Sequence, residues 1–454
     1  MNAQTETGAA ATGATAALVA ALMDCVRNVP RDAQRMSQAS LLDWIGVALP
    51  GAREPMVDAL VQDALADGGG SATLVGRSER VGTTRAALIN GAASHVLDYD
   101  DGHSAMIGHP SVGTLPALLA LAEQRRVSGK AFLAAHVLAV EAAGRIGRFV
   151  TYEHYTRGYH ATATIGAIAS ALGCAYMLGL DEQGMVAAAG VAGCRAGGLK
   201  AAFGTDMKSI QVGWAGTVGL TAAQWAARGV TAPADVLAAE QGFGQAFSSK
   251  MELDALLAPA PNGLHIYDTT YKRYAACYGT HPSIEAIRKL IAETPVAADD
   301  VECLELGIWR GADRVCNIAE PSTGLASKFS LRGVLTMALL GIDHADPAAF
   351  SDETVTRPDF IRTRQKIDVA LQDGWSSDRV TLKVRLKDGR ELSGGRDGPL
   401  WTADVDGTCA AIRDKFTSLV TPLYGASRSS EILQTVENLD ACGDMAELTG
   451  RLAG

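Results

Sequence analysis

Residues 95–111 read His-Val-Leu-Asp-Tyr-Asp-Asp-Gly-His-Ser-Ala-Met-Ile-Gly-His-Pro-Ser, and they differ sharply from the rest of the chain. Three histidines and three aspartates are concentrated here against a background rich in alanine, glycine and leucine. Carboxylates and imidazoles in this number can move protons, or they can bind a divalent metal. A solvated, aspartate-rich turn between two helices is the plainer alternative. The stretch is the candidate functional site from which the rest of the chain is best understood.

Helical periodicity leads into this stretch and away from it. Residues 81–95 predict a helix that delivers the chain into the cluster, Pro110 is expected to break the chain, and helix resumes over 115–125. Nearly continuous helix follows, with segments predicted at 129–148, 161–178, 181–194 and 212–227. The apolar run 161–180 almost reaches membrane length, but its Thr, Ser and Gly residues favour a buried helix.

The sequence pattern changes after about residue 259: the nearly continuous helical periodicity ends, and Pro and Asn-Gly residues suggest a linker. Residues 301–309 are strand-like, and residues 380–387 alternate apolar and polar side chains before an Asp388-Gly389 hairpin turn. Helices are expected at 284–292, 408–419 and 431–448, and the first ten residues are expected to form a loose tail.

These patterns predict a mainly α protein with two domains, as a length of 454 residues suggests at about 150 residues per domain. A large all-helical domain is expected to comprise residues 1–264 and 396–454. A smaller α+β domain with an antiparallel sheet is expected over residues 265–395.

Composition narrows the classes of function. Apolar residues make up 48% of the chain and charged residues 20%, so a large core can be buried. The net charge of −10 and the lack of basic clusters argue against nucleic-acid binding. Eight scattered cysteines without a C-x-x-C pair fit reduced thiols, and we see neither a signal peptide nor a membrane span. We therefore expect a cytoplasmic protein that binds no nucleic acid and no membrane.

Ordered motifs along the chain resemble those of the MmgE/PrpD family, which includes 2-methylcitrate dehydratase, cis-aconitate decarboxylase and iminodisuccinate epimerase. The resemblance spans about residues 15–420, with the motifs in family order. The motifs are Asn90-Gly91-Ala92, His95 to Asp101, Gly108 to Ser111, Gly158-Tyr159-His160, Phe203 to Lys208, Gly242-Phe243-Gly244, Tyr271 to Tyr274 with His281-Pro282, and Lys328 to Leu331.

This resemblance implies an active site between a helical domain that includes both chain ends and an α+β domain. It also implies a homodimer that acts on a small polycarboxylate without a metal or an organic cofactor. Two lysines would supply cations, two histidines would carry protons, and Asp98 would orient a histidine or act as the base. The residues on catalytic positions are Asp98, His109, His160, Lys208 and Lys272. The candidates for substrate binding are His103, Gln211, Tyr159, Arg273 and His281.

The chain departs from the family pattern in two places. Ser209-Ile210-Gln211 stands where the family often has Pro-Leu-His, and Gly102 stands where Thr or Ser is common. If these positions line the site, the substrate or the way its carboxylates are held differs from that of the named members.

The leading functional hypothesis is a cofactor-independent lyase on a small di- or tricarboxylic acid, with 2-methylcitrate dehydratase-like elimination first. Decarboxylation of a cis-aconitate-like acid and epimerisation of an iminodisuccinate-like acid share the same carbanion chemistry. A more distant alternative is a metal-dependent hydrolase built on His95, Asp98, Asp101 and His103, which bound metal would favour. A catalytically silent helical binding protein is a third alternative, which indifference to every polycarboxylate would favour.

Overall fold

The computed structural model describes residues 13–398, 400 and 404–454, so the expected N-terminal tail lies outside the described residues. The helices are α1 (Ala14–Arg27), α2 (Arg31–Gly51), α3 (Pro55–Ala66), α4 (Thr83–His95), α5 (Pro110–Arg125), α6 (Gly129–Thr156), α7 (Ala161–Met177), α8 (Glu182–Arg195), α9 (Met207–Ala226), α10 (Phe243–Phe247), α11 (His281–Glu293), α12 (Gly324–Ser327), α13 (Leu331–Leu339), α14 (Asp352–Thr356), α15 (Pro358–Arg364), α16 (Val405–Glu437) and α17 (Ala446–Leu452). The strands are β1 (Ala72–Thr73), β2 (Arg80–Val81), β3 (Gly102–His103), β4 (Thr269–Thr270), β5 (Val301–Trp309), β6 (Ile367–Gln372), β7 (Val380–Leu386) and β8 (Glu391–Arg396).

Helix α7 lies at the centre of a large helical body and packs against α5, α6, α8 and α9. Its side chains are mostly Ala, Gly, Ser and Thr, and nearly all are buried, so neighbouring backbones approach closely. The prediction of a buried helix in the run 161–180 is therefore confirmed for residues 161–175, and the helix ends at Met177. In the described part of the chain, no helix is both long and apolar enough to cross a membrane.

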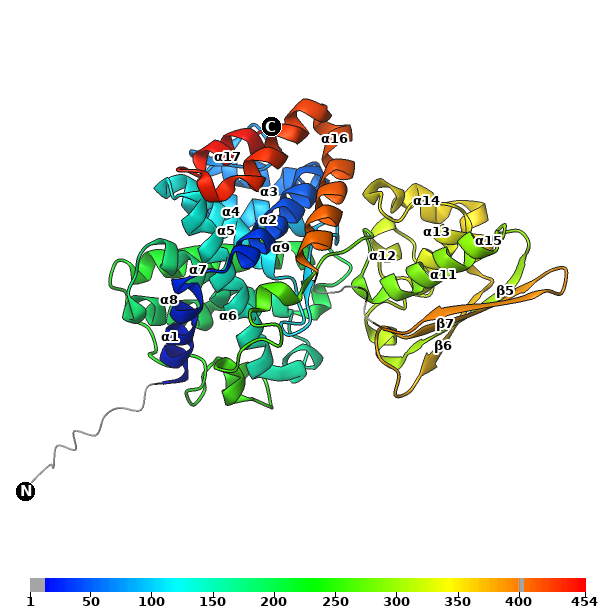
Figure 1. Ribbon diagram of the computed structural model, residues 1–454, viewed down its shortest axis with the longest axis horizontal. Helices are drawn as coiled ribbons and strands as arrows, with labels where there is room; N and C mark the ends of the chain where they lie inside the picture. The colour runs from blue at the N-terminus through cyan, green and yellow to red at the C-terminus, as the bar shows by residue number, and fades with distance from the viewer. Residues whose placement is uncertain (1–12, 399, 401–403) are drawn as a thin grey trace, which may run out of the picture.

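The C-terminal helices return to the helical body. Helix α16 packs along α2, and α17 lies beside α16 on the same body (Figure 1). Two tail helices are expected, at 408–419 and 431–448, but α16 continues through the gap between them with a single break at Gly425, whose φ is +79°. The second expected helix is wrong at its end, because α16 stops at Glu437 and α17 begins only at Ala446.

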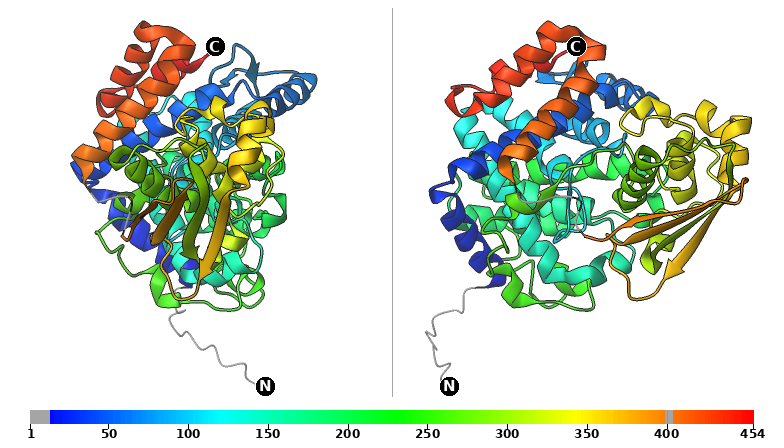
Figure 2. Two further views of the ribbon diagram at one scale, coloured as in Figure 1. Left: turned by 90° about the vertical axis from the view of Figure 1, so that its right-hand side faces the viewer. Right: turned by 45° about the vertical axis from the view of Figure 1, so that its right-hand side comes forward.

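A smaller lobe contains a four-stranded sheet in the order β6-β5-β7-β8. The pairs β5–β7 and β7–β8 are antiparallel, as expected, and Gly389 has a φ of +89° in the predicted hairpin turn. Strand β6 was not predicted and pairs parallel with β5, so the sheet is mixed. Helices α11 and α13 cover one face of the sheet (Figure 2). The fold class is confirmed: the protein is mainly α, with a smaller α+β part.

Each lobe has its own hydrophobic core, and α13 contributes to both. Leu331 and Leu335 belong to the core of the smaller lobe, whereas Val334 and Met337 belong to the core of the helical body. The two lobes are thus packed together along α13. The exact domain boundaries at 264/265 and 395/396 stay a prediction.

Two helices that frame the site start earlier than expected. Pro110 does not break the chain but is the first residue of α5, where its fixed φ suits a helix start and its missing N–H costs nothing. Helix α9 begins at Met207 rather than at residue 212, so Lys208 lies in its first turn and not in a loop.

Candidate active site

The segment between α4 and α5, residues 96–109, forms an acidic loop at the junction of the two lobes. Strand β3 in this loop pairs antiparallel with β4, which belongs to the segment that leads from the helical body to the smaller lobe. This pairing fixes the loop against a segment about 170 positions later in the chain. Candidate residues from distant motifs are thereby brought together.

Asp98 is buried in the acidic loop between two lysines. Lys208 donates a hydrogen bond to its Oδ1, and the Lys272 Nζ lies 3.1 Å from its Oδ2. Burial raises the pKa of Asp98, but the two ammonium groups outweigh burial and hold this pKa well below its usual value. Burial likewise lowers the pKa of Lys272, yet Asp98 and Asp100 outweigh it and raise that pKa. Asp98 and Lys272 are therefore a charged pair at neutral pH.

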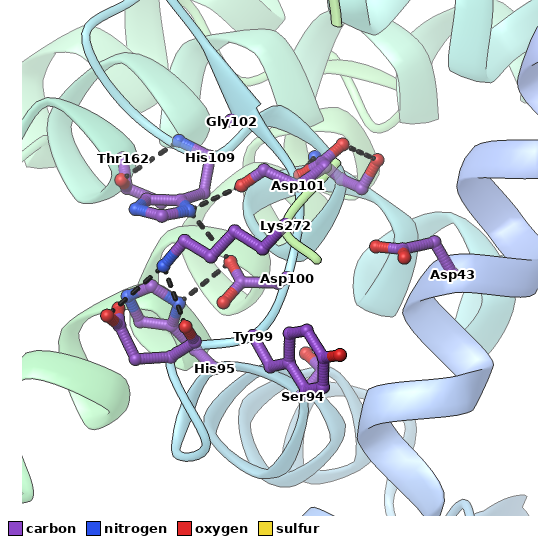
Figure 3. A network of polar contacts seen from close by, with 12 residues as sticks. Asp43, Ser94, His95, Tyr99, Asp100, Asp101, Gly102, His109, Thr162 and Lys272 are labelled. Atoms are coloured by element: carbon purple, nitrogen blue, oxygen red, sulfur yellow. Dashed lines mark hydrogen bonds and ion pairs between the residues drawn. The ribbon is translucent and has the colours of Figure 1, made fainter. Parts of the chain in front are cut away.

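Asp100 is also buried, and its Oδ2 faces two imidazoles (Figure 3). Oδ2 lies 2.9 Å from His95 Nδ1 and 3.0 Å from His109 Nδ1. Burial raises the pKa of Asp100, but these two histidines hold it well below its usual value. The carboxylate is an acceptor only, so it orients both rings through their Nδ1 atoms.

The geometry around His109 defines which of its ring nitrogens carries hydrogen. Its Nδ1 lies 2.5 Å from the main-chain oxygen of Asp101, which can only accept a hydrogen bond. Nδ1 therefore carries hydrogen, and Nε2 is left for a bound molecule. This is the arrangement of a histidine that takes up and returns a proton while a carboxylate stabilises its charged form.

His160 sits at the N-terminus of α7, and its ring lies between His95 and Phe203. The ring centroids are 5.9 Å from His95 and 5.0 Å from Phe203. Burial, followed by the nearby His95 and Lys208, lowers the pKa of His160 well below its usual value. The Gln211 side chain lies beside the ring and opposes this shift, while neither ring nitrogen has a hydrogen bond of good geometry within the described part of the chain. His160 is thus a neutral imidazole that lines the cavity and can exchange a hydrogen bond with a ligand there.

These residues border a cavity of about 480 Å³. Its wall combines charged and histidine side chains of the helical body with aromatic and apolar groups from both lobes. Six predicted residues line it, namely Asp98, His103, His109, His160, Lys208 and Lys272, and the aromatic part consists of Tyr155, Phe203, Tyr278 and Phe329. All five predicted catalytic positions are therefore brought together in one cavity between the lobes.

His103 lines the cavity, but both of its ring nitrogens are already engaged. Nε2 donates to the main-chain oxygen of His265 at 2.9 Å, and Nδ1 accepts from the Ala105 N–H at 3.2 Å. The ring therefore ties the acidic loop to the segment that carries β4.

Four predicted substrate-binding residues do not line this cavity. Tyr159 stacks on His154, with ring centroids 5.1 Å apart. The Gln211 amide bonds the main chain of a neighbouring loop, and Arg273 forms an ion pair near the surface. His281 bonds a main-chain oxygen at the start of α11 through Nε2. The structure does not bring these four side chains into contact with the space beside the lysines.

The four candidate metal ligands of the hydrolase hypothesis do not converge. His95 faces Asp100, and Asp98 is paired with two lysines. Asp101 accepts a hydrogen bond from the Ser111 side chain, and burial raises the pKa of Asp101 well above its usual value. His103 is held by main-chain groups.

A different triad offers ligand spacing, because atoms of His95, Asp100 and His109 lie within 4.8 Å of one another. In this triad the Nδ1 of His109 bonds a carbonyl oxygen, and the nearby ammonium groups of Lys208 and Lys272 repel a cation. The donor set is therefore suited to proton transfer rather than to metal binding.

Sequence reasoning gave no individual role to Asp100, and it missed the aromatic wall. Phe203 and Phe329 both lie within quoted motifs, where each sits close to a lysine in sequence. Their rings lie 5.7 Å and 5.6 Å from the Lys208 Nζ. An aromatic residue beside a motif lysine was the signal that could have found them.

The fold and the site together define a two-lobed, mainly helical protein with a buried acid–base site of lysine, carboxylate and histidine. The chain belongs to the MmgE/PrpD family. The MmgE/PrpD N-terminal domain matches residues 14–256, and the MmgE/PrpD C-terminal domain matches residues 274–441.

Several curated relatives are similar over nearly their whole length. The cis-aconitate decarboxylase of Aspergillus terreus (strain NIH 2624 / FGSC A1156) is 26% identical over 451 residues, covering 93% of this chain and 92% of that protein. The human cis-aconitate decarboxylase is 28% identical over 413 residues, covering 85% of this chain and 82% of that protein. The mouse protein of the same name is 26% identical over 448 residues, covering 92% of this chain and 89% of that protein. Family and relatives support a lyase on this scaffold, without specifying its substrate.

Proposed function

We propose that the protein removes a group next to a carboxylate of a small di- or tricarboxylic acid through a carbanion intermediate. Loss of carbon dioxide is the first candidate reaction, and 2-methylcitrate dehydratase-like loss of water is the second. The observation that carries the proposal is the meeting of the Lys208–Asp98–Lys272 ion pairs with the Asp100–His109 pair at one cavity. The proposed chemistry uses these side chains alone.

The two lysines would bind and stabilise the substrate's negative charge. An ammonium group has three N–H donors, and Lys208 gives only one to Asp98 among the described contacts. Its remaining donors can reach a substrate carboxylate in the cavity. Fixed cations in a site with an apolar, aromatic wall stabilise charge that develops beside them, because little water screens the interaction.

His109 would carry the proton. Its Nδ1–H is fixed by Asp101, its charged form is stabilised by Asp100, and Nε2 remains to exchange a proton with the substrate. His160 would act as a neutral hydrogen-bonding partner, because its pKa is held well below neutrality.

In a decarboxylation, the bond between the leaving carboxylate and its carbon breaks, and its electron pair forms a new C=C bond. The electrons of an adjacent C=C bond move to the carbon beside a second carboxylate, whose charge Lys208 and Lys272 stabilise. Protonated His109 then delivers a proton to that carbon, and solvent replaces it. In a dehydration, neutral His109 would instead remove a proton from the carbon beside the carboxylate. The electron pair of that carbanion then forms the C=C bond as the C–O bond of the neighbouring carbon breaks, and the hydroxide leaves as water with the proton that His109 returns.

Decarboxylation is placed first because the relatives above are named cis-aconitate decarboxylases. The lysines that line the cavity, Lys208 and Lys272, can pair with only a few carboxylates, which also favours a small acid. Of the two departures from the family pattern, Gln211 does not line the cavity but lies beside the His160 ring, whereas Gly102 lines the cavity, so the acid or the way it is held is expected to differ from that of the named members.

The test is turnover in heavy water with citrate, 2-methylcitrate, cis-aconitate, iminodisuccinate and simpler dicarboxylates, followed by NMR. An active acid is expected to acquire solvent deuterium beside a carboxylate, because the proton on His109 exchanges with water between turnovers. Loss of carbon dioxide identifies a decarboxylase, loss of water a dehydratase, and inversion without mass loss an epimerase. Turnover without any solvent label would contradict the carbanion mechanism.

His109→Gln is the decisive variant, because Gln keeps some hydrogen bonding but cannot carry a proton at neutral pH. A loss of about 10²- to 10⁴-fold in kcat is expected. His136→Gln is the control, since His136 is also a histidine of the helical body but is fully buried, bonds Ser37 and does not line the cavity. Unchanged kcat in His109→Gln would remove His109 from the mechanism.

A further inference from the structure

Three consecutive carbonyl oxygens of the acidic loop each accept a hydrogen bond from a different lysine. Lys328 Nζ donates to the Leu97 oxygen, and Lys272 Nζ donates to the Asp98 oxygen at 2.7 Å. Lys415 Nζ donates to the next carbonyl, that of Tyr99, also at 2.7 Å. Every backbone oxygen around Asp98 is thus fixed by a cation.

The three lysines come from widely separated parts of the chain. Lys272 follows β4, Lys328 lies between α12 and α13 of the smaller lobe, and Lys415 lies in α16. All three are shielded from solvent: the side chains of Lys272 and Lys415 are 2% and 9% exposed, and Lys328 is a buried residue. Lysine is rarely buried unless a partner compensates, so three such placements on one tripeptide need a reason.

The backbone of Asp98 supplies that reason. Its φ is +51°, in the left-handed region that residues other than glycine seldom adopt. Such a conformation persists only when surrounding contacts hold it, and it is typical of functional sites. The carbonyls on either side of Asp98 are held by Lys328 and Lys415, neither of which lines the cavity.

We propose that Lys328 and Lys415 are positioning residues of the active site, which hold the backbone of Asp98 in its left-handed conformation. The carboxylate of Asp98 is thereby kept between Lys208 and Lys272. The inference rests on the proposed function, because it assigns these lysines a role in the same site.

The hydrogen bond from Lys328 to the Leu97 carbonyl oxygen also depends on pH. Burial lowers the pKa of this lysine to about 8, with Lys272 and Lys208 adding to the shift and Asp98 and Glu54 opposing it. The Phe350 ring, 5.5 Å from Nζ, is the aromatic group beside it. Above that pH the ammonium becomes a neutral amine, whose hydrogen bond to a carbonyl is weaker.

Lys415 differs because it is paired with a carboxylate. Its Nζ lies 2.7 Å from Asp43 Oδ1, although burial still lowers the pKa of Lys415. Lys328 is therefore the better lysine for a pH test, and Lys415 for a test of positioning alone.

The first experiment measures kcat and KM of Lys328→Met and Lys415→Met on the active acid. We expect kcat to fall about 10- to 100-fold, as when catalytic groups are displaced by about 1 Å. KM should change less than about threefold, because neither lysine reaches the cavity. Lys289→Met is the control, since Lys289 is 69% exposed on α11. Folded variants with unchanged kcat would overturn the proposal.

The second experiment needs no substrate. Hydrogen exchange of the peptide that spans residues 96–102 is compared at one pH between wild type, Lys328→Met and Lys415→Met. Faster exchange in this peptide, with unchanged exchange in α1, is expected, and unchanged exchange of the loop would overturn the proposal. If wild type turns over no acid, the proposed function fails while this measurement still decides the role of the lysines.

The third experiment is the pH profile of kcat, which a merely structural lysine would not move. Wild type should lose activity on the alkaline side with a midpoint near pH 8, and Lys328→Arg should move this midpoint upward by at least about one unit, since arginine stays charged. Cys277→Ala tests the competing thiol, because Cys277 lines the cavity and a hydrogen bond with Cys316 lowers its pKa. A midpoint that Lys328→Arg leaves in place, or that Cys277→Ala removes, would overturn the assignment.

Discussion

Asp100 is the residue on which proton transfer depends, because one carboxylate oxygen faces both His95 and His109. Replacing Asp100 by Asn puts an N–H donor, or a weaker neutral oxygen, opposite His109 Nδ1. Loss of the carboxylate destabilises the imidazolium that delivers the proton in a decarboxylation, and an N–H donor there favours the tautomer with hydrogen on Nε2, which cannot remove a proton in a dehydration. Asp100→Asn should lower kcat by about 10²- to 10⁴-fold with little change in KM, measured by steady-state kinetics. Equal kcat in the variant and in wild type would show that His109 is oriented by Asp101 alone.

The charge of the lysines should matter more than their stems. Lys208→Met and Lys272→Met keep most of the side chain and delete the cation, so each should cost about 2 to 4 kcal/mol of transition-state stabilisation in kcat/KM. Lys289→Met on the surface of α11 should change kcat/KM little. Changes below about threefold in both site variants would contradict the proposed binding of carboxylates.

Asp98 and Asp101 should respond to pH in opposite directions. The folded-state pKa of Asp98 lies below its unfolded value, so its contribution to stability is present above about pH 4 and is lost as the pH falls through the folded pKa. Asp101 has a raised folded-state pKa. Its contribution to stability is therefore fully present below about pH 4, its unfolded pKa, and is lost as the pH rises through the higher folded-state pKa.

Urea unfolding at pH 5 and pH 8 tests this pair. Asp98→Asn leaves two buried ammonium groups without their carboxylate and should cost about 3 to 5 kcal/mol at both pH values. Asp101→Asn keeps the hydrogen bonds to Ser111 and should be more favourable relative to wild type at pH 8 than at pH 5. The reverse order for Asp101→Asn would mean that its carboxyl is ionised in the folded protein.

Among the secondary-structure elements near the site, α4 and α9 cross in close contact. A Cβ on Gly213 would lie 2.2 Å from the Leu88 carbonyl oxygen, whereas one on Gly216 would lie 3.6 Å from its nearest neighbour. Gly213→Ala should therefore destabilise the protein by about 1 to 3 kcal/mol, since α9 must shift. Gly216→Ala, one turn later, should be neutral or stabilising by up to about 1 kcal/mol through helix propensity. Equal unfolding midpoints in urea for the two variants would contradict this packing.

The sequence could predict those elements whose apolar or small residues recur with the regular spacing of a helix or a strand. The alternation at residues 380–386 and the small-residue helix 161–177 carry their own signal, and both are present as predicted. Strand β6 is short, and four of its six residues are only half-buried, so its alternation is weak. Its position is decided by parallel pairing with β5, a contact between segments about 63 residues apart that no local pattern encodes. Pro110 was misjudged because proline ends a helix at most positions and begins one at its first residue.

The site could be predicted only as far as its motifs reach. The motif histidines and lysines converge as expected, because they match the family's pattern residue by residue. Tyr159 and Arg273 sit next to residues that line the cavity, yet they lie outside it, since a neighbour in sequence points to another side of the chain. Which side of a turn faces the cavity depends on tertiary packing, and the sequence alone does not state it.

At the scale of the whole molecule, one face of the helical body carries exposed apolar side chains. Leu199, Met207 and Trp214 are 56%, 39% and 49% exposed, and they surround a hollow of about 900 Å³ next to α9. We propose that a second copy of the chain covers this face, since exposed apolar surface of this kind typically marks an interface. Gly198, in the same hollow, accepts a hydrogen bond from the His160 main-chain N–H, so this face borders the backbone that carries His160.

Trp214→Glu should convert such a dimer to a monomer, because it places a charge in the apolar contact. The readout is sedimentation velocity, and Leu253→Glu is the control, since Leu253 is 54% exposed but lies outside the hollow. A wild-type protein that sediments as a monomer would contradict the proposal.

The three lysines that hold residues 97–99 also set the order of events during synthesis on the ribosome. Leu97, Asp98 and Tyr99 emerge early, but the partner of Tyr99 is Lys415 in α16, more than three hundred residues later. Until α16 has been translated and has docked on α2, the loop lacks one of its three anchors. A nascent chain stalled before α16 should therefore lack contacts that complete both the helical body and the loop, so that catalytic competence arrives with the last part of the polypeptide.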